Sequence, residues 1–396
     1  MRMTQLKTIA DIQTGPFGSQ LHKEDYVETG TPIVTVEHLG NRVFTEQNLP
    51  RVSDSDKARL IKYTLSTGDI VFSRVGSVDR CSYVDKSHDG WMFSGRCLRV
   101  RPTELVDSLY LYYYFCLEET KQFVRNIAVG ATMPSINTKL LGEVEIALPD
   151  LNNQKRIAAV LSSLDDKIEN NQKLNDNLYA QAKATTKQWI SKSTGDYELL
   201  PLSDIASINP DTYSPKETWK YVNYLDTSSI TEGCISEIQH ITPSSEKLPS
   251  RARRKIALND IVFSTVRPNQ RHYGIISEPL PNMLGSTGFA VIRSKNPLVC
   301  NELIYLCLTE NEFIEKMQQL AEQSTSTFPS IKPSDLGVCK IPCPKDQSST
   351  SFTETLKSLF ALIAANQREN ISLSEIRDAL LPKLMSGEID VSDIQL

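Results

Sequence analysis

Alternation of apolar and polar residues predicts β-strands in two separate parts of the chain. The stretches GDIVFSRV at 68–75 and NDIVFSTV at 259–266 alternate in this way directly after a turn, and CLRVR at 97–101 and FAVIR at 289–293 have the same pattern. The chain therefore contains at least two sheet-forming regions.

Apolar runs near these strands predict buried helices and closing strands. SLYLYYYFCL at 108–117 and ELIYLCL at 302–308 are typical of buried helices, whereas 141–149 and 336–344 are typical of strands that end in proline. A mixture of sheet with few long helices predicts an α+β fold.

Two long segments show a different, helical pattern. In a predicted helix over 153–190, apolar residues recur at alternating intervals of four and three positions from Ile157, and the pattern returns from Phe352. Two asparagines interrupt each series at matching places, which favours pairing of the two helices, because buried asparagines fix register and partner choice. Pro382 is expected to kink or end the second helix. The expected coiled-coil positions are Ile157, Leu161, Leu164, Ile168, Asn171, Asn175, Leu178, Leu356, Leu359, Ile363, Asn366, Asn370 and Leu373.

A helix of about 38 residues is about 57 Å long. If two such helices pair in antiparallel fashion, their asparagine layers meet near the middle, and the pair is a rigid spacer that relates two globular units by a pseudo-twofold axis. The alternative is two ordinary amphipathic helices, each packed on its own domain.

The same landmarks occur twice in the same order. LKTIADI at 6–12 returns as LSDIASI after 196 residues, the strand at 68–75 returns after 191, and TMPSI at 132–136 returns as TFPSI after 195. A duplication explains this order. The predicted fold is α+β, with two homologous α/β domains joined by two long helices that form an antiparallel coiled coil. The expected boundaries are 1–150 for the first domain, 151–195 for the central helix, 196–348 for the second domain and 349–396 for the C-terminal helix.

Composition adds limits on the class of protein. The eight cysteines are scattered without a zinc-like spacing, so free thiols are expected rather than a metal site. Neither a membrane-spanning run nor an apolar leader segment is expected, and the cytoplasm is the expected location. The net charge of −5 argues only weakly against nucleic-acid binding, because phosphate contact requires a local basic face.

Polar and basic side chains gather in loops that follow the matched strands. Arg, Asn and Gln read base edges, and Lys and Arg supply the contacts to phosphate. The alternative for any single arginine is a solvated surface charge. The residues expected to bind DNA are Ser19, Gln20, Ser73, Arg74, Ser77, Arg80, Arg96, Thr132, Arg251, Arg253, Arg254, Lys255, Thr265, Arg267, Asn269, Gln270, Arg271 and Thr327.

The combination of these motifs resembles the specificity subunits of type I restriction-modification systems. It includes the two DIVFS strands, the TMPSI and TFPSI loops, a run from Pro149 to Ile168 of the form PxxxxQ(K/R)IAxxLSxLDxKI, and LLPKLMSGEIDV at 380–391. The resemblance covers essentially the whole chain. The second copy departs from the family pattern, because LFALIAANQ at 359–367 stands where the first copy has LDDKIENNQ. The two halves are therefore not expected to contact their partner subunits equally.

The resemblance implies a non-catalytic subunit. Each globular domain would be a target-recognition domain that reads one half of a split, asymmetric site in double-stranded DNA, and the coiled coil would set the unread gap. The helices would dock two modification subunits, which carry S-adenosylmethionine and methylate adenine, and translocase-nuclease subunits would join them. No cofactor is expected on this chain.

A search for catalytic motifs gives no candidate. Asn209-Pro210-Asp211-Thr212-Tyr213 is the closest match to a methyltransferase loop but lacks its second proline, and no nucleotide-binding lysine motif occurs. Asp69 and Asp260 each open a strand, where a turn-capping role suffices. Three alternatives stay open: a coiled-coil adaptor that binds protein, an enzyme with unrecognised residues, and a specificity subunit of a methylation-only system.

Overall fold

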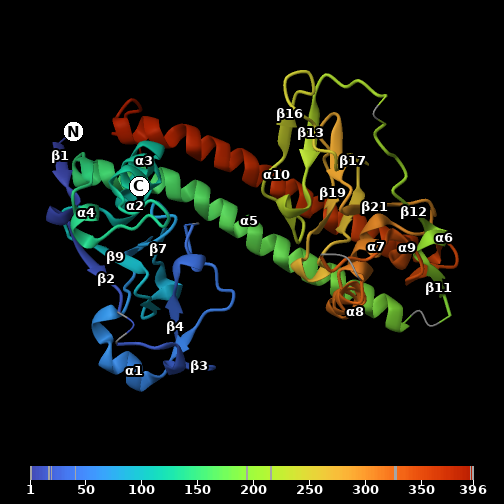
Figure 1. Ribbon diagram of the computed structural model, residues 1–396, viewed down its shortest axis with the longest axis horizontal. Coiled ribbons are helices and arrows are strands. Elements are labelled where there is room, and N and C mark those ends of the chain that lie inside the picture. Colours follow the sequence, from blue (N-terminus) through green and yellow to red (C-terminus); the bar gives the residue numbers. More distant parts are fainter. Residues whose placement is uncertain are drawn as a thin grey trace. The chain divides into compact units, whose positions relative to one another are not determined.

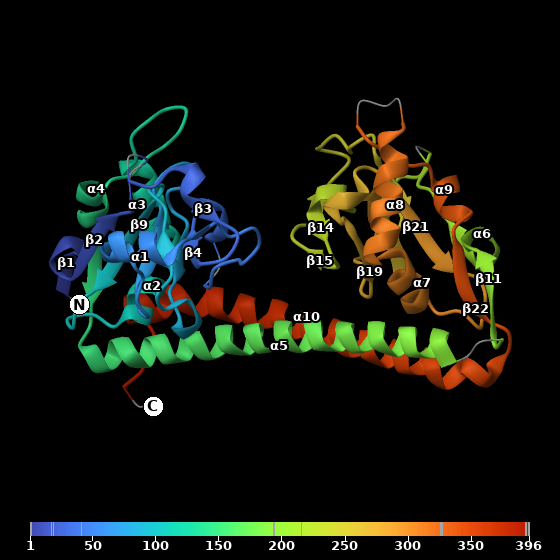
Figure 2. The ribbon, with the colours of Figure 1, turned by 90° about the horizontal axis from the view of Figure 1, so that it is seen from below.

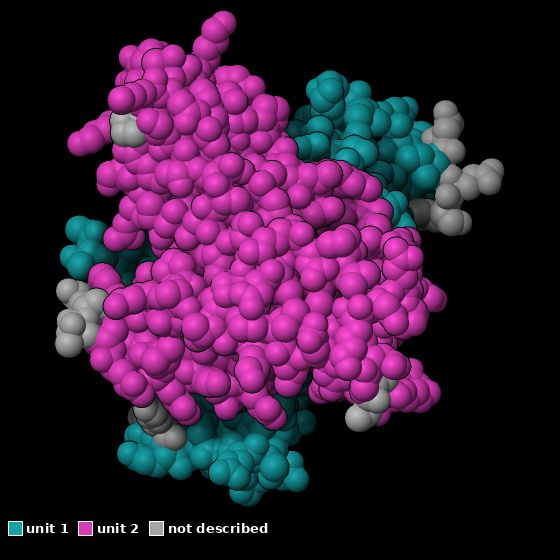
Figure 3. Space-filling model, turned by 90° about the vertical axis from the view of Figure 1, so that its right-hand side faces the viewer, with its two compact units in different colours: residues 1–170, 369–396 teal, residues 171–368 magenta. Residues whose placement is uncertain are grey.

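The computed structural model describes residues 2–16, 18, 20–40, 42–192, 195–214, 216–324, 328–392 and 394. The chain forms two compact units, which Figure 3 distinguishes by colour. Unit 1 comprises residues 1–170 and 369–396, and unit 2 comprises 171–368. Each unit contains its own sheets and its own hydrophobic cores.

Unit 1 is built on a four-stranded antiparallel sheet with the order β2-β9-β6-β7. A second sheet has the order β3-β5-β4-β8, with β4 and β8 parallel, and β1 pairs with β10. The strands are β1 (Arg2–Gln5), β2 (Ala10–Thr14), β3 (Tyr26–Val27), β4 (Thr31–Val34), β5 (Arg51–Val52), β6 (Ile70–Ser73), β7 (Cys81–Tyr83), β8 (Met92–Phe93), β9 (Cys97–Pro102) and β10 (Glu145–Leu148).

Helices cover one face of the first sheet in unit 1, where α2 lies beside β7 (Figure 1). The edge-to-face pair of Phe72 on β6 and Phe115 on α2 has ring centroids 4.7 Å apart and lies in this core. The helices that begin in unit 1 are α1 (Asp54–Arg59), α2 (Ser108–Cys116), α3 (Glu118–Ile127), α4 (Thr138–Gly142) and α5 (Leu151–Lys192).

Unit 2 repeats this plan. Its antiparallel sheet has the order β12-β21-β18-β19, its second sheet has the order β16-β13-β20-β17 with β13 and β20 parallel, β11 pairs with β22, and β14 pairs with β15. Strand β18 matches β6 and β21 matches β9, as the repeat predicted. The strands are β11 (Tyr197–Pro201), β12 (Ala206–Ile208), β13 (Val222–Leu225), β14 (Ile230–Thr231), β15 (Cys234–Ile235), β16 (Gln239–Ile241), β17 (Ala252–Lys255), β18 (Asp260–Ser264), β19 (Tyr273–Ile276), β20 (Met283–Ser286), β21 (Phe289–Ser294) and β22 (Lys340–Pro344).

The helices of unit 2 pack on the sheet as in unit 1, with α7 against β18, β19 and β21 (Figure 2). The apolar run at 302–308 lies within this buried helix, as predicted. The helices that begin in unit 2 are α6 (Leu202–Ile205), α7 (Asn301–Leu308), α8 (Asn311–Glu322), α9 (Pro333–Gly337) and α10 (Thr350–Ser386).

Asp69 and Asp260 have the same structural role in their units. Asp69 accepts hydrogen bonds from Nε and Nη2 of Arg101 at 2.7 and 2.6 Å, and Asp260 accepts them from Arg293 at 2.7 and 2.8 Å. Each carboxylate also accepts from a backbone amide three residues earlier, at 2.8 Å. Because the carboxylates are buried and fully used, they anchor the turn before the strand.

The long helices α5 and α10 contact each other in antiparallel fashion within each unit. In unit 1, Asp165 accepts a hydrogen bond from Arg377 at 2.6 Å. In unit 2, Trp189 stacks on Phe352 with ring centroids 4.4 Å apart. Helix α10 does not end at Pro382 but continues to Ser386.

Candidate nucleic-acid interface

In each unit, three segments that are far apart in the sequence are held together at the end of a central strand. We name them the post-strand loop, which follows β6 or β18, the pre-strand turn, which precedes β9 or β21, and the tip loop, which contains the repeated TxPSI motif. In unit 1 they comprise residues 74–80, 94–96 and 129–135. In unit 2 their described parts comprise residues 265–272, 286–288 and 328–330.

Backbone hydrogen bonds join the three segments of unit 1. The amide of Arg74 donates to the carbonyl of Arg96 at 2.8 Å, and the amide of Gly76 donates to the carbonyl of Pro134 at 2.8 Å. The amide of Ile136 donates back to the carbonyl of Arg74 at 2.9 Å. The post-strand loop therefore contacts both of its neighbours.

Unit 2 contains the same three hydrogen bonds. The amide of Thr265 donates to Gly288 at 2.8 Å, the amide of Arg267 donates to Pro329 at 2.9 Å, and the amide of Ile331 donates to Thr265 at 2.9 Å. Because different side chains occupy one backbone arrangement, the two units present different chemistry from a common scaffold.

Several predicted side chains lie on these segments and are accessible. The polar side chains of this kind in unit 1 are those of Ser77, Arg80, Arg96 and Thr132. Those in unit 2 are Arg267, which is half-buried, Asn269 and Gln270. Arginine, asparagine and glutamine can form paired hydrogen bonds with base edges.

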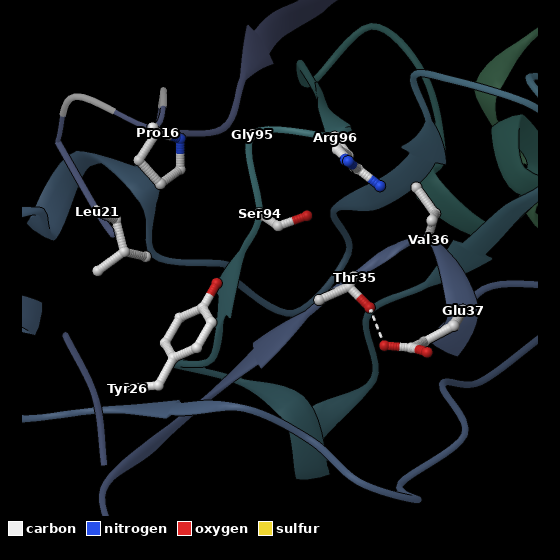
Figure 4. Close-up of a pocket in the computed structure, with 10 residues that line it drawn as sticks. Pro16, Leu21, Tyr26, Thr35, Val36, Glu37, Ser94, Gly95 and Arg96 are labelled. Carbon is white, nitrogen blue, oxygen red and sulfur yellow. Dashed lines mark hydrogen bonds between the residues drawn. The ribbon is translucent and has the colours of Figure 1, made fainter. Parts of the chain in front are cut away.

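A surface hollow of about 510 Å³ lies beside the pre-strand turn of unit 1. Figure 4 shows that Ser94 and Arg96 line it together with Thr35 and Glu37, whose side chains are joined by a 3.0 Å hydrogen bond. The hollow therefore combines a guanidinium, which suits guanine, with a carboxylate, which suits the amino group of cytosine.

Two predicted contact residues are wrong because their side chains are buried. Ser73 and Thr265 are only 2% and 7% exposed. The Ser73 hydroxyl donates to the carbonyl of Val75 at 2.8 Å, and the Thr265 hydroxyl donates to Gly288 at 2.9 Å. These hydroxyls shape the loops and are not directed to a ligand.

Three further arginines make contacts within the protein. Nη1 of Arg74 donates to the carbonyl of Gly95 at 3.1 Å, which fastens the pre-strand turn. Arg271 donates to Glu232 at 3.1 Å and to Asn311 at 2.9 Å. The guanidinium of Arg80 passes so close to Gly40 that an added Cβ would lie 2.6 Å from Nη2. Arg74 and Arg271 therefore hold the loops in this structure, and their expected contact with DNA stays a prediction.

The basic run at 251–255 is largely a strand, β17, and not a free basic loop. Nζ of Lys255 donates to Glu217 at 2.7 Å and lies over the ring of Trp219. Partial burial lowers the pKa of the Arg254 guanidinium. These two residues are half-buried and packed on the domain, and their expected contact with DNA stays a prediction. Arg251 is exposed, and its carbonyl accepts from the amide of Thr287 at 2.8 Å, which places it beside the pre-strand turn.

Two other residues that were expected to bind DNA already form side-chain hydrogen bonds within the protein. Oε1 of Gln20 accepts a hydrogen bond from the hydroxyl of Tyr63 at 2.8 Å, so the side chain is already anchored. Arg253 is half-buried, and its Nε donates to the carbonyl of Ser250 at 3.3 Å. Each of these side chains therefore has only some of its polar atoms left for a contact with DNA.

Sequence reasoning missed two apolar side chains on the tip loops. Met133 is 64% exposed, and Phe328 is 51% exposed at the matching position before proline. The guanidinium carbon of Arg267 lies 4.8 Å from the centroid of the Phe328 ring. The available signal was the TMPSI and TFPSI repeat itself, in which a large apolar residue stands in an otherwise polar loop.

The chain is similar in sequence to a family of DNA specificity domains and to known specificity subunits. Residues 1–180 match the family model described as the type I restriction modification DNA specificity domain. The MjaIX specificity subunit from Methanocaldococcus jannaschii is 27% identical over 316 residues, which cover 74% of this chain and 72% of that protein. The HindI specificity subunit from Haemophilus influenzae is 22% identical over 405 residues, which cover 83% of this chain and 88% of that protein.

Over most of its length, the chain is therefore similar to type I restriction specificity subunits. A solved S subunit from M. genitalium shares the fold, with a TM-score of 0.57 at 18% identity, over 97% of this chain and 95% of that one.

The predicted coiled-coil positions of the chain lie on α5 and α10. Within unit 2, Nδ2 of Asn366 donates to Oδ1 of Asn175 at 2.8 Å. Within unit 1, Asn370 reaches the carbonyl of Ile168 at 3.5 Å. The buried members are Ile157, Leu161, Asn171, Leu178, Leu356 and Leu359. The half-buried members are Leu164, Ile168, Asn175, Ile363, Asn366, Asn370 and Leu373.

Two predicted residues cannot be placed in the described part of the chain. Ser19 and Thr327 lie outside the described residues. Among the described residues, no group of three or more His, Cys, Asp or Glu side chains is placed to hold a metal ion. No described helix is both long enough and apolar enough to cross a membrane.

Proposed function

We propose that this chain is the DNA-specificity subunit of a type I restriction-modification complex. Each unit reads one half of a split, asymmetric site in duplex DNA. The observation that carries the proposal is the repeated three-segment interface, because one backbone arrangement presents a different set of side chains in each unit. Two different half-sites require such a scaffold.

The chain contributes recognition and not catalysis in this proposal. Two modification subunits dock on α5 and α10, bind S-adenosylmethionine and methylate adenine, while translocase-nuclease subunits cut unmodified DNA in the cytoplasm. The two buried aspartates that resemble catalytic carboxylates are fully used by Arg101 and Arg293, which supports a non-catalytic role.

The test is to express the chain with its modification subunit and map methylated adenines by long-read sequencing. We expect a split motif with a fixed gap. An Arg267→Ala variant is expected to relax or abolish the half of the motif that unit 2 reads and to keep the other half.

A control variant is Leu258→Ala, which removes a side chain that is 63% exposed at the end of β18 opposite to the loops and is expected to leave the motif unchanged. An assembled complex that methylates no fixed motif and binds DNA without sequence preference would contradict the proposal and favour a protein-binding adaptor.

A further inference from the structure

Met133 and Phe328 occupy one position of the duplicated scaffold. Each precedes a proline whose carbonyl accepts a hydrogen bond from the post-strand loop, from Gly76 in unit 1 and Arg267 in unit 2. Both side chains remain largely in solvent, as their exposed fractions show. Exposed apolar groups at the same point of two recognition loops indicate a function in binding rather than in packing.

The tip loop of unit 1 holds this side chain on a rigid support. Val129 and Ser135 exchange two backbone hydrogen bonds of 2.8 Å, which closes the loop. Gly130 has a φ of +114°, and an added Cβ would lie 2.7 Å from the carbonyl oxygen of Met133. The loop is therefore tightly built around the exposed methionine.

In unit 2, the exposed ring is combined with a cation at some cost to the backbone. Arg267 has a φ of 47°, in the left-handed region that disfavours side chains, whereas the matching Gly76 has a φ of 75°. The guanidinium of Arg267 lies over one face of Phe328. Strain of this kind persists where a side chain is required by function.

The major groove offers a partner for each of these groups. Thymine presents a 5-methyl group there, which apolar side chains contact, and guanine presents O6 and N7, which arginine contacts. Apolar side chains that wedge between base steps enter from the minor groove and partly unstack the bases. Because Arg267 covers one face of Phe328, a contact at the groove edge fits better than a wedge.

We propose that Phe328 and Met133 each recognise the 5-methyl group of a thymine, one in each half-site, and that Arg267 reads a guanine next to the thymine of Phe328. The inference rests on the proposed function, since it assigns specificity to residues of that interface. It predicts an A·T pair in each half-site at the position that the tip loop faces.

The test replaces thymines of the mapped target with deoxyuridine, one at a time, in duplexes bound by the full chain assembled with its modification subunits. Loss of one buried methyl group is expected to weaken binding about fourfold at one position of the half-site. Phe328→Ala is expected to remove this sensitivity in the half-site of unit 2 only, and Met133→Ala in the other half-site only.

Two further variants separate the contact from general effects. Phe328→Met, which carries the residue type of the other copy, is expected to retain sensitivity to deoxyuridine. Leu258→Ala removes a side chain that is 63% exposed at the opposite end of β18 and is expected to leave binding and sensitivity unchanged.

The following results would overturn the inference while the proposed function stands. They are specific binding by the unaltered chain that no deoxyuridine changes, Phe328→Ala complexes that keep the sensitivity, and a half-site without an A·T pair. Increased 2-aminopurine fluorescence beside the tip loop on binding would also overturn it, in favour of a wedge. Absence of any preference for the target over random DNA would instead overturn the proposed function and the inference together.

Discussion

At the scale of single residues, the two copies differ most informatively at Gly76 and Arg267. Both have left-handed backbone conformations, with φ of 75° and 47°, but only glycine adopts this conformation without steric cost. Apart from its chain neighbours, no atom of the described residues lies within 4 Å of a Cβ built on Gly76, so the cost of a side chain there is a backbone cost. Unit 2 therefore keeps an arginine at a position where glycine is the more stable choice.

We predict that Arg267→Gly is more stable than Arg267→Ala by about 1 kcal/mol, because both remove the guanidinium but only glycine relieves the strain. Both variants are expected to lose about 1–3 kcal/mol of binding to the half-site of unit 2 if the arginine pairs with a base. Urea unfolding gives the stabilities, and titration of labelled duplexes gives the affinities.

The reciprocal control is Gly76→Ala, which is expected to destabilise the chain by about 1 kcal/mol for the same reason. Equal stabilities of the glycine and alanine variants at 267 would show that the left-handed conformation carries no strain. Equal losses on target and random DNA would indicate that Arg267 contacts a phosphate and not a base.

At the scale of elements, the sequence pattern located strands, helices and loops well but not the exposure of each side chain. The alternating runs became β6 and β18, and the repeat correctly predicted that their loops correspond. Ser73 and Thr265 were misjudged because the loop folds back over the strand end, which depends on contacts with segments far away in the sequence. The run at 251–255 was interpreted from its basic residues alone, and the strand that it forms with β20 was missed.

The asparagine layer of the long helices provides a prediction at this scale. Asn175 and Asn366 form one half-buried hydrogen-bonded pair. Replacing both with leucine is expected to stabilise the chain by about 1 kcal/mol and to broaden its register or oligomeric state, because the polar pair favours one alignment.

Urea unfolding and light scattering coupled to size-exclusion chromatography measure the two effects. The matched control is Asn175→Leu alone, which leaves the amide of Asn366 without its partner and is expected to destabilise by about 1 kcal/mol. If the double variant were less stable than this single variant, the pair would be contributing stability and not selecting register.

At the scale of the whole molecule, overall charge was a poor guide to function. The chain carries a net charge of −5, yet its arginines gather on loops that recur in both units. Many of these arginines hold the loops in place, as Arg74 and Arg271 do, and fewer remain to contact DNA. Sequence alone does not separate these two roles, because the ion pairs join residues tens of positions apart.

The final prediction concerns the gap between the two half-sites, which we propose the long helices to set. Deleting one heptad from each helix at matching layers, residues 169–175 and 366–372, removes the asparagine layer, keeps the remaining apolar positions in step and shortens each helix by about 10 Å. Because base pairs are about 3.4 Å apart along duplex DNA, the preferred gap is expected to shorten by about three base pairs. Binding is lost instead if the new spacing rotates one half-site about the DNA axis so that its unit no longer reaches it. Methylome mapping of the assembled complex measures the gap directly, and circular dichroism checks that the shortened helices form.

Deleting the heptad from α5 alone is the control, since it mismatches the two helices and is expected to destabilise the chain. A folded double deletion that methylates a motif with the original gap would exclude the helices as the determinant of spacing.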